Sequence, residues 1–269
     1  MIGCPAYEET SLEPLTAKGR NRALQAGLGA RDMEESVWAC TLCGYCDAVC
    51  PKQVRNVEIV LQLRRELHGA SRLSVPAARD LVLGCTIRER AAWLVPSITR
   101  FLERIGRPAA AEPEGCCGSL DVEAGRARPA RARAGVVADP VCLEQYDADF
   151  LGALALERLE LFTLKPPFYY FVPHRLVNRD HARYYPLYDR LRRETGCETN
   201  LDLNRLARST TAGSVQGLSG INARDVRGAV QRLLRHSKAE RIVTCSPADY
   251  LAFRQHSGRE TKFITECLR

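Results

Sequence analysis

The sequence contains no long apolar run. A membrane-spanning helix needs roughly 18 or more predominantly apolar residues, and even the most apolar stretch, residues 167–173 (PFYYFVP), is closely bracketed by Lys165 and Arg175. No basic stretch followed by an apolar run opens the chain, so we expect no secretory signal. These absences predict a cytoplasmic protein with reduced thiols, which reaches a membrane only through partner subunits.

A glycine-rich turn between a strand and a helix is also missing. Such turns cradle phosphates, so the sequence predicts no bound flavin or nicotinamide. The formal net charge is +7, which would suit nucleic acid, an anionic membrane face or an acidic partner. The one basic cluster, residues 125–135 (GRARPARARAG), has no interleaved aromatics to stack bases. We therefore expect no nucleic-acid partner and interpret this cluster as a solvated or partner-facing loop.

Cysteine, in contrast, is abundant, with 12 in 269 residues. A chain of this length buries a core without disulfide staples. The cysteines therefore indicate metal or redox chemistry.

The densest cysteine group is CTLCGYCDAVCP, which has the spacing C-x2-C-x2-C-x3-C-P of bacterial ferredoxins. In that run the first three thiolates bind one 4Fe-4S cubane, and the cysteine before proline binds a different cluster. Zinc sites favour separated C-x2-C pairs instead. The run predicts a 4Fe-4S cluster on Cys40, Cys43 and Cys46, with Cys50 in the Cys-Pro position.

The fourth ligand of this cluster has two candidates. Cys4 is followed by Pro5, as Cys50 is followed by Pro51, and in two-cluster ferredoxins each Cys-Pro serves the cluster of the other motif. Only three residues precede Cys4, so the first cysteine triplet is absent. We predict that Cys4 completes the cubane; the alternative is a fully local set that includes Cys50.

The segments GCPAYEETSLEPLTAKGR and WACTLCGYCDAVCPKQV resemble the helical ferredoxin domain of a group of iron-sulfur subunits. The resembled subunits are those of glycolate oxidase, anaerobic glycerol-3-phosphate dehydrogenase and heterodisulfide reductase. They normally hold two cubanes. Because the first three ligands are missing here, the expected number is one.

Four further cysteines form a second group. Cys85 ends a predicted strand, Cys116 and Cys117 stand side by side before Gly118, and Cys142 follows Asp-Pro-Val. Adjacent cysteines do not easily bond to each other, but with glycine relieving the crowding both sulfurs can face one metal centre. The pattern predicts a metal site on these four thiolates.

The second group resembles the CCG domain of heterodisulfide reductase and its relatives. The resemblance maps four cysteines onto four of five ligands and puts Asp139 at the fifth, an oxygen ligand poorly suited to an iron-sulfur cluster. A zinc ion, a 2Fe-2S cluster and a non-cubane 4Fe-4S cluster all remain open. An iron-sulfur cluster is favoured over zinc because the rest of the chain has the features of an electron-transfer protein.

The resemblance extends to residue 269 as a tandem repeat whose second copy is degenerate. His174 stands where the repeat has cysteine, residues 209–213 (STTAG) replace Cys-Cys-Gly, and Cys245-Ser246-Pro247 remains of the closing motif. We expect this copy to bind no cluster and His174 to be structural. Cys197 and Cys267 fit no pattern.

The predicted fold is α+β, in three parts. Residues 1–76 are a helical ferredoxin-like domain, 77–160 the first α/β CCG subdomain and 161–269 the second. Apolar runs predict strands over 80–85, 135–138, 168–172 and 241–244, and helical spacing predicts helices over 88–105, near 187–193 and over 226–236.

These patterns predict an iron-sulfur electron-transfer subunit of a dehydrogenase, quinone-linked or heterodisulfide-reductase-like complex. The implied partners are a flavin dehydrogenase subunit, a ferredoxin-like carrier or a quinone-reactive membrane subunit. The alternative is a catalytic subunit that reduces a disulfide or quinone at the Cys85 group. The resembled heterodisulfide reductase uses two complete copies, so the single complete copy here disfavours heterodisulfide cleavage.

Overall fold

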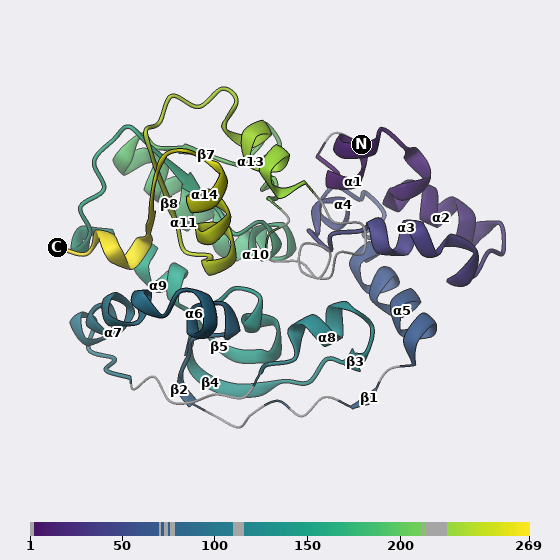
Figure 1. The fold of residues 1–269 in the computed structure, drawn as a ribbon, viewed down its shortest axis with the longest axis horizontal. Helices are drawn as coiled ribbons and strands as arrows, with labels where there is room; N and C mark the ends of the chain where they lie inside the picture. Colours follow the sequence, from purple (N-terminus) through teal and green to yellow (C-terminus); the bar gives the residue numbers. More distant parts are fainter. Residues whose placement is uncertain are drawn as a thin grey trace.

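A computed structural model of the chain describes residues 3–69, 71–72, 75, 79–109, 116–210, 212 and 225–269. It combines many short helices with small parallel sheets, which confirms the predicted α+β class. The helical N-terminal segment lies at one end of the molecule, beside two sheet-containing parts (Figure 1). The boundary expected near residue 76 lies outside the described residues.

The N-terminal segment consists of five short helices and two 3-10 turns. They are α1 (Pro5–Thr10), η1 (Glu13–Leu15), α2 (Ala17–Gln25), η2 (Arg31–Met33), α3 (Glu34–Ala39), α4 (Tyr45–Ala48) and α5 (Asn56–His68). The apolar face of α5 packs inward, because Val57 and Val60 are buried in one cluster with Val37 and Leu42. This small core fixes the loop that carries the C-x2-C-x2-C run.

The first α/β part contains a three-stranded parallel sheet of order β2-β4-β5. Its strands are β2 (Arg79–Val82), β4 (Ala132–Val137) and β5 (Tyr146–Phe150), with α6 (Cys85–Arg90), η3 (Ala92–Leu94), α7 (Val95–Arg104), α8 (Ser119–Glu123) and η4 (Cys142–Gln145) around them. A two-stranded parallel pair, β1 (Ser71–Arg72) with β3 (Ala127–Arg128), lies at its edge.

The continuous helix predicted over 88–105 is wrong. The helical stretch starts earlier, at Cys85, and breaks at Ala91, whose backbone leaves the helical region at φ −145°. Pro96 then starts α7 in the first helical turn, where the missing proline N–H is not needed. The strand β5 was not predicted, because YDADF carries two exposed or half-buried acids in place of an apolar run.

The second α/β part contains a four-stranded parallel sheet of order β7-β6-β8-β9. Its elements are β6 (Phe168–Phe171), α10 (His174–Arg179), α11 (His181–Thr195), β7 (Glu198–Thr199), α13 (Val226–Leu234), β8 (Arg241–Thr244), α14 (Pro247–His256), β9 (Glu260–Phe263) and η6 (Ile264–Cys267). Helix α9 (Leu151–Glu157) and η5 (Leu159–Leu161) lead into it.

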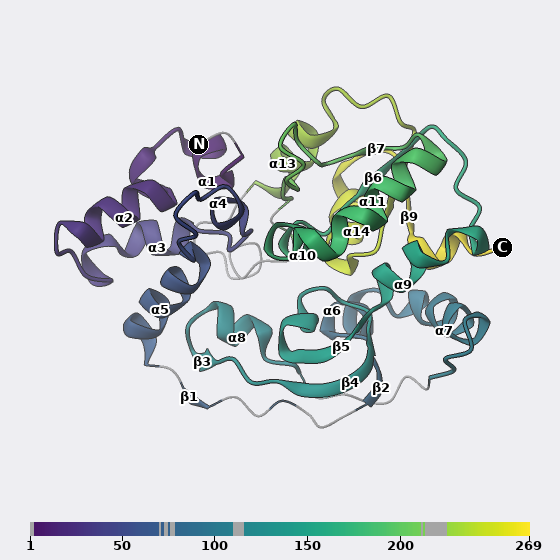
Figure 2. The same cartoon turned by 180° about the vertical axis from the view of Figure 1, so that it is seen from behind.

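Helices cover both faces of this sheet (Figures 1 and 2). Consecutive residues of β6 point to opposite faces: Tyr170 stacks on Tyr188 of α11, and Phe171 meets Phe253 of α14 edge-on. The two sheets also share one core, in which Leu81 and Phe150 belong to the same buried cluster as Phe168. Among the described helices, none combines the length and apolarity that crossing a membrane requires.

Candidate metal centres

Four cysteines line one cavity in the N-terminal segment. The cavity has a volume of about 670 Å³, and Cys4, Cys40, Cys43 and Cys46 are in its wall. Cys4 caps the start of α1, Cys40 ends α3, and Cys46 lies in α4. We call these four residues the N-terminal cysteine site.

Tight backbone turns bring Cys40, Cys43 and Cys46 together. Leu42 has a φ of +54° and Gly44 a φ of +75°, so the chain reverses twice between Cys40 and Cys46. The left-handed conformation is unusual for leucine, and it is held here because the Leu42 side chain is buried in the helical core. These turns therefore place the three closely spaced cysteines around one pocket.

The electrostatics of the site favour a bound cation. Burial raises the pKa values of Cys4 and Cys46, and it raises that of Cys43 to about 12. Repulsion from neighbouring thiolates adds to each rise, with Cys40 acting on all three. Such thiols become thiolates when a metal centre supplies the compensating charge.

Cys50 lies outside this arrangement. It is absent from the wall of the cavity, and its Sγ accepts a hydrogen bond from the Val54 amide at 3.4 Å. In the residues that the structure describes, no three His, Cys, Asp or Glu side chains are placed to hold a single metal ion. The N-terminal cysteines instead surround a cavity much larger than one ion needs, which suits a cluster.

The second group of cysteines also lines one cavity, although no three of them are placed to hold a single metal ion. Cys85, Cys116, Cys117 and Cys142 line a cavity of about 60 Å³ together with Asp139. We call these four cysteines the second cysteine site. The Sγ atoms of Cys117 and Cys142 are 3.2 Å apart, and Cys116 is the exposed member.

Two glycines make room for the second cysteine site. Gly118 has a φ of +72° at the start of α8, where glycine adopts the left-handed backbone without strain. A side chain on Gly84 would come within 2.8 Å of Asp139 and 3.0 Å of the Cys142 sulfur. Gly84 therefore relieves crowding at this site, as Gly118 was expected to do. Sequence reasoning missed this role of Gly84.

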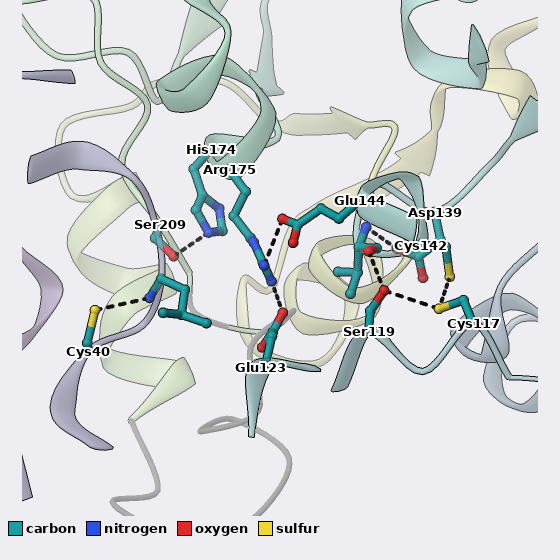
Figure 3. A network of polar contacts seen from close by, with 12 residues as sticks. Cys40, Cys117, Ser119, Glu123, Asp139, Cys142, Glu144, His174, Arg175 and Ser209 are labelled. Carbon is teal, nitrogen blue, oxygen red and sulfur yellow. Dashed lines mark hydrogen bonds and ion pairs between the residues drawn. The ribbon is translucent and has the colours of Figure 1, made fainter. Parts of the chain in front are cut away.

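Hydrogen bonds shift the pKa values of two thiols of this site in opposite directions. The bond with Cys142, followed by that with Ser119, lowers the pKa of Cys117 to about 7, whereas the same bond raises the pKa of Cys142. Burial raises the pKa of Asp139, whose carboxylate accepts the Val141 amide at 3.0 Å. Figure 3 shows Cys117, Cys142 and Ser119 converging beside Asp139.

The second α/β part repeats this geometry with other residues. His174 follows β6 by three residues, as Cys85 follows β2. Asp249 follows β8 by five residues, as Cys142 follows β4. The hydrogen-bonded pairs are also repeated. Thr210 donates to Asp249, as Cys117 bonds to Cys142 in the first part. Ser209 bonds to His174, as Cys116 bonds to Cys85 in the first part.

This correspondence revises the interpretation of Cys245. It occupies the position of Ala138, one residue after its strand, and Ser246 takes the position of Asp139. The Cys245 side chain is fully buried beside Gly152. His174 is also buried, and burial lowers its pKa to about 3. Thr211 and Gly213 lie outside the described residues.

The second copy also forms part of the second cysteine site. Ala212 and Ala248 line the same small cavity as the four cysteines. The site is therefore closed by side chains from both α/β parts.

Sequence reasoning missed a buried ion-pair network between the two cysteine sites. Arg175, on α10, pairs with Glu123 of α8 and with Glu144 of η4, and Arg179 also pairs with Glu144. Figure 3 shows Arg175, Glu123 and Glu144 between Cys40 on one side and Cys142 on the other. A lone arginine in a helical pattern gives no signal of such burial, so only the packing reveals it.

The comparison with known families agrees with the N-terminal chemistry. Residues 2–54 match the family described as a 4Fe-4S dicluster domain. No curated protein and no solved structure shows significant similarity to the chain. This match supports an iron-sulfur protein that carries a 4Fe-4S cluster in its N-terminal segment, and such a cluster indicates a role in electron transfer.

Proposed function

We propose that this protein is an electron-relay subunit of a multi-subunit oxidoreductase. In the proposal a 4Fe-4S cluster is held by Cys4, Cys40, Cys43 and Cys46, and a second metal centre is held by the second cysteine site. The observation that carries it is the shared cavity: the four N-terminal cysteines surround one space, from which Cys50 is absent.

The number of clusters follows from the number of thiols. Residues 2–54 contain five cysteines, whereas two cubanes with four thiolates each need about eight. We therefore propose one cubane in the matched segment. When bound, such a cluster supplies reversible one-electron transfer.

The second metal centre is the end of the relay nearer the electron acceptor or donor that the complex converts chemically. Its cavity, about 60 Å³, is roughly a tenth of the size of the N-terminal cavity, about 670 Å³, which favours a compact group. Cys116 is exposed and Asp139 replaces the fifth thiolate of the resembled domain. A site with one hard oxygen ligand leaves a weakly held position, whereas four thiolates close the cubane.

Partner subunits belong to the same proposal. An electron relay requires a dehydrogenase or carrier on one side and an acceptor on the other. A flavin dehydrogenase subunit, a ferredoxin-like carrier and a quinone-reactive membrane subunit are the classes that fit.

The test compares metal and acid-labile sulfide in anaerobically purified wild type and in a Cys116→Ser/Cys117→Ser variant. About four irons plus zinc in the wild type identifies one cubane and a zinc site, and about six or eight irons identifies a second cluster. The variant should keep about four irons and the cubane's electron paramagnetic resonance signal, while turnover of the reconstituted complex collapses.

Two results would contradict the proposal. Wild-type protein without iron and sulfide would remove the cubane. Unchanged turnover in the double variant would show that the second centre is outside the electron path and has a structural role.

A further inference from the structure

We infer that Arg20 and Arg64 are built-in counter-charges of the N-terminal cysteine site and raise the reduction potential of the cluster bound there. The inference rests on the proposed function for the presence of that cluster. It assigns to two arginines a role that neither the cysteine pattern nor the family match contains.

Both side chains are buried charges. Arg20 is 3% exposed and Arg64 is 1% exposed. Arg20 donates to the backbone oxygens of Leu15 and Ser36 at 3.0 and 2.7 Å. Its side chain also lines the cavity of the four cysteines.

Arg64 reaches the cysteine run directly. Its guanidinium donates to the Cys40 carbonyl at 2.6 Å, to the Val37 carbonyl at 3.2 Å and to the Glu123 carbonyl at 2.7 Å. Its charged end also lies 4.8 Å from the centre of the Trp38 ring. The side chain is held on several sides, so its charge has a fixed position beside Cys40.

Neither arginine has a carboxylate partner among the ion pairs of the described residues. Arg175, the third buried arginine of the described residues, pairs with Glu123 and Glu144. A buried cation without a counter-charge is strongly unfavourable. The arrangement therefore requires negative charge from another source.

The cysteines are that source. Arg20 lines the cavity that the four cysteines surround, and the Arg64 guanidinium donates to the Cys40 carbonyl at 2.6 Å. A cubane with four thiolates is an anion that becomes more negative on reduction, and nearby fixed cations stabilise the reduced form more than the oxidised form.

The experiment measures the midpoint potential of the cluster in the full-length protein by redox titration followed by electron paramagnetic resonance. Arg20→Gln and Arg64→Gln remove one charge each, and Arg20→Lys and Arg64→Lys keep it. Matched controls are Arg22→Gln at the exposed Arg22 on α2 and Arg65→Gln at the half-buried Arg65 on α5, and iron content is determined for every variant.

We expect each glutamine variant to shift the potential to more negative values, by several times the shift of its control, and the two shifts to add. The lysine variants should stay close to wild type. If the glutamine variants fail to load iron, lysine variants that load it at the wild-type potential still support the charge role.

Two outcomes overturn the inference. One is a glutamine variant with full iron content and an unchanged potential. The other is a pair of lysine variants that fold but load no iron, which would show that hydrogen-bond geometry matters and charge does not. Wild-type protein without a cluster would instead refute the proposed function, so the two failures are distinguishable.

Discussion

At the scale of single residues, the choice of the fourth cubane ligand depends on position in space. Cys4 and Cys50 both precede a proline, so their local sequence does not separate them. Cys4 faces the cavity because α1 begins at Pro5 and turns its capping residue inward. Cys50 follows α4 and points its sulfur back to Val54.

We predict that Cys4→Ser removes the cubane signal from the electron paramagnetic resonance spectrum of the reduced protein, because serine is a poor iron ligand at this position. Cys50→Ser is the matched control and should leave both the signal and the iron content close to wild type. A lost signal in the Cys50 variant, with the Cys4 variant intact, would reverse the assignment.

At the scale of elements, the two α/β parts use the same strand-to-helix turn for different chemistry. Thiols at the helix starts of the first part are replaced in the second by a hydrogen-bonded set that includes His174 and Asp249. Burial raises the pKa of Asp249 to about 6 from an ordinary value of 3.8. A buried carboxyl of this kind stabilises the fold in its protonated form.

The sign of the pH dependence follows from linkage. Between about pH 4 and 6 the native state holds more protons at Asp249 than the unfolded chain, so stability falls as pH rises through this window. The shift corresponds to about 3 kcal/mol at most. Asp249→Asn removes the titration, so its free energy of unfolding should decline less from pH 4 to 7 than that of wild type.

Urea unfolding at several pH values measures this difference, with the exposed Asp147→Asn as the control that should follow wild type. If the free energies of unfolding of wild type and of Asp249→Asn change in parallel with pH, Asp249 ionises in the folded protein without a loss of stability. That result would contradict the prediction.

At the scale of the whole molecule, one buried network ties the three parts together. Arg175 of the second α/β part pairs with Glu123 and Glu144 of the first, and Arg64 of the helical segment bonds the Glu123 backbone. Helix α10, which carries Arg175, also packs on α4 of the helical segment. The two cysteine sites therefore keep a fixed relative position.

We predict that Arg175→Gln destabilises the protein by about 3–5 kcal/mol, because it removes the cation that faces the buried Glu123 carboxylate, while Glu144 keeps its pair with Arg179. The exposed pair of Arg190 with Glu194 provides a control, and Arg190→Gln should leave the free energy of unfolding close to that of wild type. Unfolding by urea measures both. Adding Glu123→Gln to the Arg175 variant should recover part of the loss, and a loss below about 1 kcal/mol would contradict the prediction.

The sequence by itself determined the kind of chemistry and the main elements. The run of Cys40, Cys43 and Cys46 is local, so its spacing alone predicts a cluster, and the apolar runs at 168–172 and 241–244 predict strands that the structure contains as β6 and β8. Short-range patterns of this kind carry their own signal because neighbours in the chain stay neighbours in the fold.

Only the tertiary structure decided which distant residues meet. It brought Cys4 into the cavity of a run that starts 36 residues later, and it put Asp249 in the position of Cys142. It also buried Arg20 and Arg64 beside the cysteines, where they donate to backbone carbonyls. Such contacts depend on how separate helices and sheets pack, and no local spacing in a single sequence encodes that packing.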